Sequence, residues 1–295
     1  MLIAHTSPAE HGVIVGLGMI AVVVYGIGWW RSGKMSAWRL VAWCGGVTAL
    51  LISVIPAMET WALESFAGHM VQHLLMIVVA APLLVVANPN RAIRALGVMP
   101  DRVTPAERSV AGWWRSNGAI ASAALFVGVL YITHLTAIYD KALTNRFVHD
   151  TEHVAYIASA IALWAALRGT ARRAAPARIG AVFAVIAGSA LLGVVLLSAS
   201  SPLVPTYEAV RGTRSAIDDQ RAAASLMWVG GMATTLPLLL ISVWSWASSE
   251  ERIAVRSEAL ADRRSDPHAP PTDPTQRSRE QFAHGAPEEF TRSQD

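Results

Sequence analysis

Long apolar stretches separated by short polar ones run through most of this chain. Seven of them are long enough to cross a hydrocarbon core of about 30 Å, which takes roughly 20 helical residues. Their approximate ranges are 11–30, 38–56, 67–87, 118–138, 149–168, 178–200 and 222–247. Because apolar residues follow one another instead of alternating with polar ones, helices are expected and barrel strands are not. The pattern predicts an all-α polytopic membrane protein with seven transmembrane helices.

The composition agrees with a membrane protein and separates a different C-terminal segment. Of the 295 residues, 53% are hydrophobic and 15% are charged. From Ser248 onward, Arg, Asp, Glu, Ser and Pro predominate and little apolar surface remains to be buried. Such a segment is typically disordered. The expected organisation is a short external segment (1–10), a seven-helix membrane domain (11–247) and a disordered cytoplasmic tail (248–295).

Arginine and lysine are distributed unevenly among the loops, and this sets the expected orientation. The loops after the first, third and fifth spans are rich in cations, which are Arg31, Lys34, Arg39, Arg91, Arg94, Arg102, Arg108, Arg115, Arg168, Arg172, Arg173 and Arg178. The alternate loops carry fewer cations, and residues 57–66 carry none. We therefore expect the N-terminus outside and the C-terminus in the cytoplasm. This distribution also accounts for the basic charge balance, so no nucleic-acid partner is expected.

The histidines of the membrane domain gather at one predicted depth, near the outer surface. His69 and His73 open the third span, while His149 and His153 open the fifth. Each pair is four residues apart, so both rings lie on one face of their helix. His134 lies near the outer end of the fourth span. Since polar side chains at membrane depth usually face the bundle interior, the pairs favour a metal or haem site over structural packing, and His134 fits either role equally.

Other polar groups at the same depth can bind a metal or orient an imidazole. These are Asp150, Glu152, Asp219 and the thioethers of Met58, Met70 and Met227. Asp218 or Asp219 can instead cap the helix that they open, and methionine in an apolar helix usually packs. We expect His5 and His11, which precede or open the first span, to reach the headgroups or bond a neighbouring carbonyl.

Imidazole accommodates zinc, copper, iron and nickel, whereas thioether sulfur favours cuprous copper. Copper is therefore the first choice, and haem held axially by paired histidines is the alternative. A retinal protein is excluded because Lys34 and Lys141, the chain's two lysines, both fall in loops. The segment "HDTEH" at 149–153 also fits the H-x-x-E-H pattern of zinc hydrolases, with Glu152 as the base. This pattern is short and arises by chance, so an enzyme is not expected.

Three motifs, in this order, resemble the seven-helix CtaG-type cytochrome c oxidase assembly factors, a polytopic bacterial family. They are "HMVQHLLMIVVAAPLLVVANP" at 69–89, "ITHLTAIYDKALTNRFVHDTEHVAYIASAIALW" at 132–164 and "DDQRAAASLMWVGG" at 218–231. The resemblance implies a bacterial plasma-membrane protein that helps to deliver copper to a haem-copper oxidase subunit on the outer side. It carries the family's recurrent positions onto His69, Gln72, His73, His134, Tyr139, Asp140, His149, Glu152, His153, Asp219, Gln220, Met227 and Trp228. Thr133, Thr136 and the "AAAS" after Arg221 depart from the family pattern but leave the candidate ligands intact.

Our hypothesis from the sequence is an outward-facing copper site, with His69, His73, His149 and His153 as ligands. Four further residues lie nearby or orient those ligands in this hypothesis: His134, Glu152, Asp219 and Met227. The expected partners are haem-copper oxidase subunits and the lipid bilayer, and no small-molecule substrate is identified. The alternative is a metal-free membrane platform that holds oxidase subunits, in which these polar side chains tie the helices together.

Overall fold

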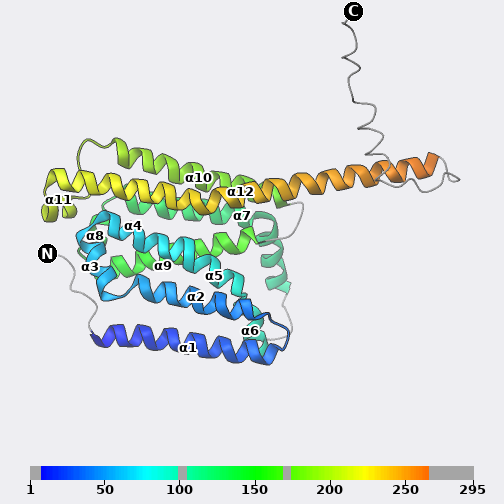
Figure 1. The fold of residues 1–295 in the computed structure, drawn as a ribbon, viewed down its shortest axis with the longest axis horizontal. Coiled ribbons are helices and arrows are strands. Elements are labelled where there is room, and N and C mark those ends of the chain that lie inside the picture. The colour runs from blue at the N-terminus through cyan, green and yellow to red at the C-terminus, as the bar shows by residue number, and fades with distance from the viewer. Residues whose placement is uncertain (1–7, 99–104, 169–173, 266–295) are drawn as a thin grey trace, which may run out of the picture. The chain divides into compact units, whose positions relative to one another are not determined.

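The computed structural model describes residues 8–98, 105–168 and 174–265, and all regular elements in these ranges are helical (Figure 1). In chain order they are α1 (Pro8–Ser32), α2 (Ala37–Ser53), α3 (Pro56–Glu64), α4 (Phe66–Leu74), η1 (Leu75–Ala80), α5 (Ala81–Ala87), α6 (Pro89–Ala95), α7 (Pro105–His134), α8 (Ile138–Ala142), α9 (Arg146–Leu167), α10 (Ala175–Ser198), α11 (Pro205–Arg211) and α12 (Thr213–Ser265). The predicted all-α class is confirmed. His5 and residues 266–295 of the predicted tail lie outside the described residues.

Most of the predicted spans fall on helices that are long and apolar enough to cross a membrane. Five qualify in the described part of the chain: Ala9–Ser32, Phe66–Ala95, Arg108–His134, Ala175–Ser198 and Thr213–Glu258. A sixth arises if α2 and α3, bent by 52° at their junction, form one span. The predicted fifth span is α9, whose first turns carry too many charged and polar side chains to qualify by composition. The count of seven and the orientation therefore stay predictions.

The third predicted span is a continuous rod made of α4, η1 and α5. Its middle part, η1, is a π-helix in which the amide of Ala81 reaches back to the carbonyl of Met76. Pro82 gives a physical reason for this turn, because proline has no N–H and its ring would meet the carbonyl of Val78 in a regular α-helix. The rod ends at Asn88, which adopts the left-handed conformation with φ of 57°.

The helix α9 occupies the interior of the first of two compact units, which ends at Val243. It packs against α5, α7, α8 and η1 (Figure 1). Its buried positions recur every three or four residues and are His149, Glu152, His153, Tyr156, Ser159, Ala160 and Leu163. The buried stripe is therefore polar at the start of the helix and apolar at its end. At the end of the helix, the buried side chains Ala160 and Leu163 belong to a hydrophobic cluster.

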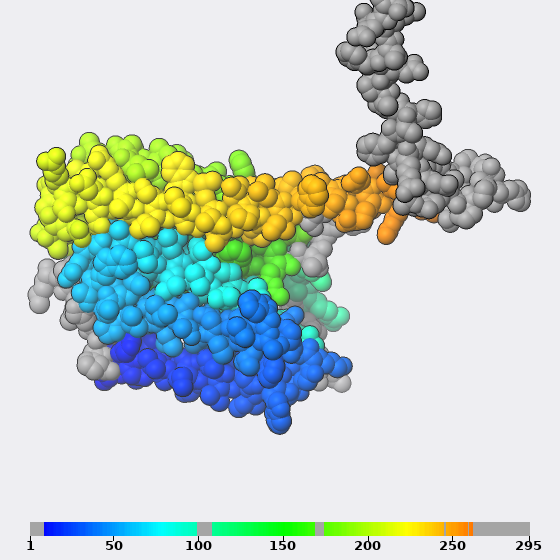
Figure 2. Space-filling view, in the orientation of Figure 1, coloured from blue at the N-terminus to red at the C-terminus, as the bar shows by residue number. Residues whose placement is uncertain are grey.

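Three short helices, α3, α8 and α11, gather at one end of this unit, which we call the site end (Figure 1). The helix α6 and the connection between α1 and α2 lie at the opposite end. In the space-filling view, α1, α2, the α4–α5 rod and the first part of α12 cross one face as successive bands (Figure 2). The longer helices therefore connect the two ends.

The second unit begins at Trp244, and its described part is helical up to Ser265. This corrects the predicted disorder for residues 248–265. The sequence there is rich in Ala, Glu, Arg and Leu, which favour helix without any buried surface. Trp246 also donates a hydrogen bond to the Glu250 carboxylate one turn later, at 3.1 Å. Local propensity therefore favours a helix in this segment, although it has almost nothing to bury.

Candidate metal centre

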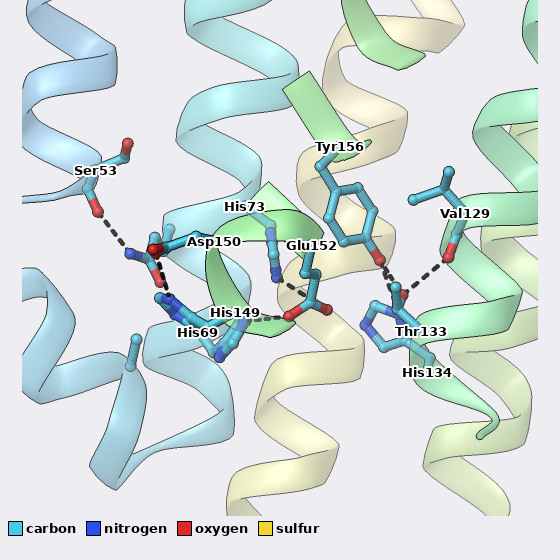
Figure 3. A network of polar contacts seen from close by, with 12 residues as sticks. Ser53, His69, His73, Val129, Thr133, His134, His149, Asp150, Glu152 and Tyr156 are labelled. Atoms are coloured by element: carbon cyan, nitrogen blue, oxygen red, sulfur yellow. Dashed lines mark hydrogen bonds and ion pairs between the residues drawn. The ribbon is translucent and has the colours of Figure 1, made fainter. Parts of the chain in front are cut away.

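Three imidazoles from two helices meet inside the bundle, and Figure 3 shows two of them, those of His69 and His73. His69 and His73 project from α4, and His153 projects from α9. One ring nitrogen of each lies within 4.8 Å of one nitrogen of the other two, and all three residues are buried. The ring centroids of His69 and His73 are 4.4 Å apart, and those of His73 and His153 are 5.3 Å apart. Three of the four predicted ligands thus come together.

These imidazoles keep buried nitrogen atoms that have no hydrogen-bond partner among the described residues. The atoms are Nε2 of His69, both ring nitrogens of His73 and Nε2 of His153. Buried polar atoms in proteins are nearly always paired, and each unpaired one costs about 1–3 kcal/mol. Several unpaired ring nitrogens close together are therefore expected to have a partner that is not a protein group. Neutral imidazole nitrogen is a common metal ligand.

The Glu152 carboxylate faces the two histidines of α4 from α9 (Figure 3). Its Oε2 lies 3.7 Å from Nε2 of His69, and its Oε1 lies 3.8 Å from Nε2 of His73. Both oxygens are buried without a hydrogen-bond partner in the described part of the chain. A buried carboxylate beside neutral rings is unfavourable unless a cation or a proton accompanies it. Imidazoles together with a carboxylate suit copper or zinc, so these residues fit a transition-metal ion.

His149, the fourth predicted ligand, lies beside this group and outside it. Its ring centroid is 4.2 Å from that of His153 and 5.8 Å from that of His69. Its Nδ1 is 3.8 Å from the Asp150 carboxylate, a side chain that is 60% exposed. Since His149 is not part of the three-nitrogen group, the H-x-x-E-H pattern does not by itself define the ligand set.

His134 supports the group from α7 through a hydrogen-bonded network. Its Nδ1 lies 2.9 Å from the carbonyl of Leu130, 3.1 Å from the Thr133 hydroxyl and 3.1 Å from the Tyr156 hydroxyl. The ring of Tyr156 in turn packs on His73, with centroids 4.3 Å apart. His134 thus acts on the three imidazoles through Tyr156, although its Nε2 is also buried without a partner among the described residues.

Asp219, in the second turn of α12, binds the first turn of α4 and does not cap its own helix, as the sequence had also suggested it could. Its Oδ1 accepts a hydrogen bond from the Ser65 hydroxyl at 2.8 Å, and its Oδ2 accepts one from the Phe66 amide at 2.6 Å. Ser65 also caps α4 by accepting from the Gly68 amide at 3.2 Å. Asp219 therefore fixes the start of the helix that carries two of the imidazoles.

Three more residues carried over by the family resemblance also bind the backbone of another element. Gln72, Asp140 and Gln220 contribute the side chains. The contacts are Gln72 Nε2 to Ser53 O at 2.6 Å, Thr206 N to Asp140 Oδ1 at 2.9 Å, Leu203 N to Gln220 Oε1 at 2.8 Å and Gln220 Nε2 to Leu196 O at 3.0 Å. These amides and carboxylates hold helices and loops together around the site, whereas the imidazoles keep free nitrogens.

Two tyrosines outside the candidate spans form a wall of the site. The Tyr207 hydroxyl donates to the Ala62 carbonyl at 2.6 Å and lies 3.5 Å from Nδ1 of His69. The Tyr139 ring lies 4.9 Å from that of His69. Burial raises the pKa of both phenols well above the ordinary value, so both stay protonated. Sequence reasoning missed Tyr207, which has no local signal, and Tyr156, which follows His153 by three residues on the same face of α9.

Met227, proposed from the sequence as an additional ligand, lies in a hydrophobic cluster with Phe66 and Leu130. It also lines an apolar cavity together with the neighbouring Trp228. These described surroundings are apolar, as is typical of a packing residue.

Comparison with known proteins gives one family and several distant relatives. A family model described as cytochrome c oxidase caa3 assembly factor matches residues 23–249. An uncharacterized protein of Mycobacterium leprae is 29% identical over 271 residues, covering 85% of this chain and 40% of that protein. An uncharacterized protein of Mycobacterium bovis is 26% identical over 272 residues, covering 85% of this chain and 41% of that protein. The chain thus spans about two fifths of the curated relatives' length. No solved structure matches it.

Proposed function

The chain belongs to the cytochrome c oxidase caa3 assembly factor family, and from this premise we propose that it holds a copper ion for transfer to an oxidase subunit. Family membership and the apolar helices make it a multi-pass protein of the bacterial plasma membrane. An assembly factor associates with the oxidase while the oxidase matures. This favours a role other than catalysis for the chain. Copper is the cargo in this proposal.

The observation that carries the proposal is the group of unpaired atoms around His69, His73 and His153. Three imidazole nitrogens lie within 4.8 Å of one another, and the buried Glu152 carboxylate faces two of these rings. A copper ion would give these nitrogens a partner and would balance the carboxylate charge. Three protein ligands leave one side open, and an open coordination position is what ligand exchange with a client requires.

Copper is favoured over the other ions that imidazole binds because the family serves a copper-containing enzyme. Haem is disfavoured by the packing of the rings. The centroids of His69 and His73 are 4.4 Å apart, and those of His149 and His153 are 4.2 Å apart. A porphyrin needs a flat slot between two separated axial ligands, and rings in mutual contact do not provide it.

We propose that the site end faces outward. The opposite end carries Arg31 at the end of α1 and Arg91 and Arg94 in α6, so the cation-rich loops lie away from the imidazoles. Cytoplasmic loops are the ones enriched in Lys and Arg. The copper site would then open toward the side on which an external oxidase subunit receives its copper.

Elemental analysis and spectroscopy of the purified protein test this function. We expect copper in the wild-type protein and its loss when His69 and His153 are both replaced by Ala. His11→Ala, which removes a histidine of α1 outside the cluster, is the matched control and should retain copper. Unchanged copper content in the double variant rules the site out, and a Soret band would show that haem is bound instead.

A metal-free assembly platform is the second candidate, and the ties made by Asp219, Gln72 and Gln220 favour it. In that case the imidazoles serve only to hold the bundle together. His69→Ala with His153→Ala would then lower the amount of folded protein in the membrane along with oxidase activity. If the protein stays abundant and the oxidase alone loses copper, the platform explanation is wrong.

A further inference from the structure

All four imidazoles of the site are buried, His153 is no less exposed than His149, and the exposed side chain beside them is that of Asp150. The side chains of His69 and His73 are 0% and 4% exposed, while that of His149 is 10% exposed and its neighbour Asp150 is 60% exposed. The ring of His153 contacts those of both His73 and His149, with centroids 5.3 and 4.2 Å apart. A continuous series of metal-binding side chains thus leads from the buried group to the protein surface.

His149 lies beside the buried group without belonging to it. It precedes His153 by one helical turn on α9, and the ring centroids are 4.2 Å apart. On its other side, its Nδ1 lies 3.8 Å from the Asp150 carboxylate (Figure 3). A ring with the buried site on one side and an exposed carboxylate on the other has the geometry of an intermediate position.

Arg146 forms two ion contacts near His149, one with Asp150 and one with Glu10. Arg146, one turn earlier on α9, lies 3.6 Å from the Asp150 carboxylate and 2.9 Å from that of Glu10 on α1. The first turn of α9 is therefore joined to α1 at the same level. Asp150 thus has Arg146 near one carboxylate oxygen and His149 near the other.

We propose that His149 and Asp150 form a transfer position through which the copper ion enters and leaves the three-imidazole site. This inference rests on the proposed function. The step is a ligand exchange: a His149 nitrogen bonds the ion while a bond to His69 or His73 breaks, and His153 stays bound. The oxidation state of copper does not change, and no electron or proton acceptor is required. The exposed Asp150 carboxylate attracts the cation and stabilises the His149 ring in its orientation.

The kinetics of copper removal test the transfer position. Purified protein loaded with cuprous copper is mixed with bathocuproine disulfonate, and extraction is followed by absorbance. His149→Leu should retain the copper content but slow extraction about tenfold or more. Loss of a residue that supports the metal ligands typically costs about 10–100-fold in metal affinity or activity, and we expect a similar effect on the extraction rate. His149→Met, of matched size, restores a copper-binding atom and should extract at close to the wild-type rate.

Asp150→Asn provides a second variant that does not disturb packing, because this side chain is mostly exposed. It should slow extraction in the same direction, whereas Asp218→Asn, an exposed acid on α12, should leave the rate unchanged. Equal extraction rates in all variants would overturn the inference. Loss of copper in His149→Leu would also overturn it and make His149 a permanent ligand, with the proposed function intact. Absence of copper from the wild-type protein would instead remove the proposed function and this inference with it.

Discussion

At the scale of single residues, Glu152 has the most unusual surroundings in the site. Its side chain is 1% exposed, and its carboxylate lies 3.7 Å from His69 and 3.8 Å from His73. In the described part of the chain, no lysine or arginine forms an ion pair with it. An ionised carboxylate at such a position needs a cation, and in the proposed function copper is that cation.

Replacing Glu152 with Gln should weaken copper binding about 10–100-fold, because the isosteric amide removes the negative charge beside the ion and keeps the volume. The protein should still fold, since a neutral amide is easier to bury than an unpaired carboxylate. Competition between the protein and a calibrated chelator measures the affinity. A zinc hydrolase would respond differently, retaining its metal and losing turnover.

Asp218→Asn is the control for this variant, because it removes one negative charge from a side chain that is 71% exposed. It should leave the affinity for copper unchanged, as charges in solvent are well screened. If Glu152→Gln binds copper as tightly as the wild-type protein, then Glu152 has no part in holding the ion.

At the scale of helices, the position of the imidazoles depends on how α4 begins. The first amides of a helix have no partner within the helix, and a carboxylate next to them is stabilising. Asp219 supplies this carboxylate from α12 and accepts hydrogen bonds from Ser65 and Phe66. The fold thus connects the start of the last long helix to the helix that carries His69 and His73.

Asp219→Ala should therefore lower the free energy of unfolding by about 2 kcal/mol, the typical contribution of hydrogen bonds to a buried charged group. The expected readout is a lower Tm in detergent, accompanied by weaker copper binding as α4 loosens. The adjacent Asp218→Ala should change stability by less than about 0.5 kcal/mol, because surface substitutions rarely do more. Equal effects of the two variants would mean that the contact with α4 is unimportant.

The polar faces of the helices that carry the site could be predicted from the sequence. The four-residue spacing of His69 and His73, and of His149 and His153, indicates which helix faces are polar, and the structure places those faces against each other. Spacing alone gives no means to separate His149 from His153, because both lie on the same stripe. The relative height of α4 and α9 decides this, and it depends on packing between distant segments.

Other features lay beyond sequence reasoning for identifiable reasons. The partner of Asp219 is 154 residues away in the chain, whereas the local pattern suggested a cap for its own helix. The predicted disorder after Ser248 rested on the lack of apolar surface and overlooked helix propensity, which extends α12 to Ser265. In both cases the decisive interaction is one that hydrophobic periodicity does not report.

At the scale of the whole membrane unit, the two ends differ in chemistry. The site end has the imidazoles and the short helices α3, α8 and α11, while α6 at the other end contributes Arg91 and Arg94. Arg168, at the end of α9, donates a hydrogen bond to the Val85 carbonyl near that same end. The two ends of the unit can therefore be told apart by charge. Because cytoplasmic loops are enriched in Lys and Arg, we expect the end with α6 to face the cytoplasm.

Labelling with a membrane-impermeant maleimide tests this direction in a background in which Cys44, the single cysteine, is replaced by Ser. Leu203→Cys places a thiol on a 43% exposed residue at the site end and should react in intact cells. Val98→Cys, at a 72% exposed residue beyond α6, should react only after permeabilisation. The reverse pattern would place the imidazoles on the cytoplasmic side and would contradict delivery to an external subunit.

The π-helical turn between α4 and α5 has a consequence for comparing sequences. Its closing contact, from Ala81 to Met76, encloses one residue more than an α-helical turn does. Dropping a single residue from Leu75–Ala80 would convert the turn to regular helix and leave both flanking faces in register. We therefore expect a one-position gap here when this chain is aligned with homologues whose third span lacks the proline, and the histidine columns should still superimpose.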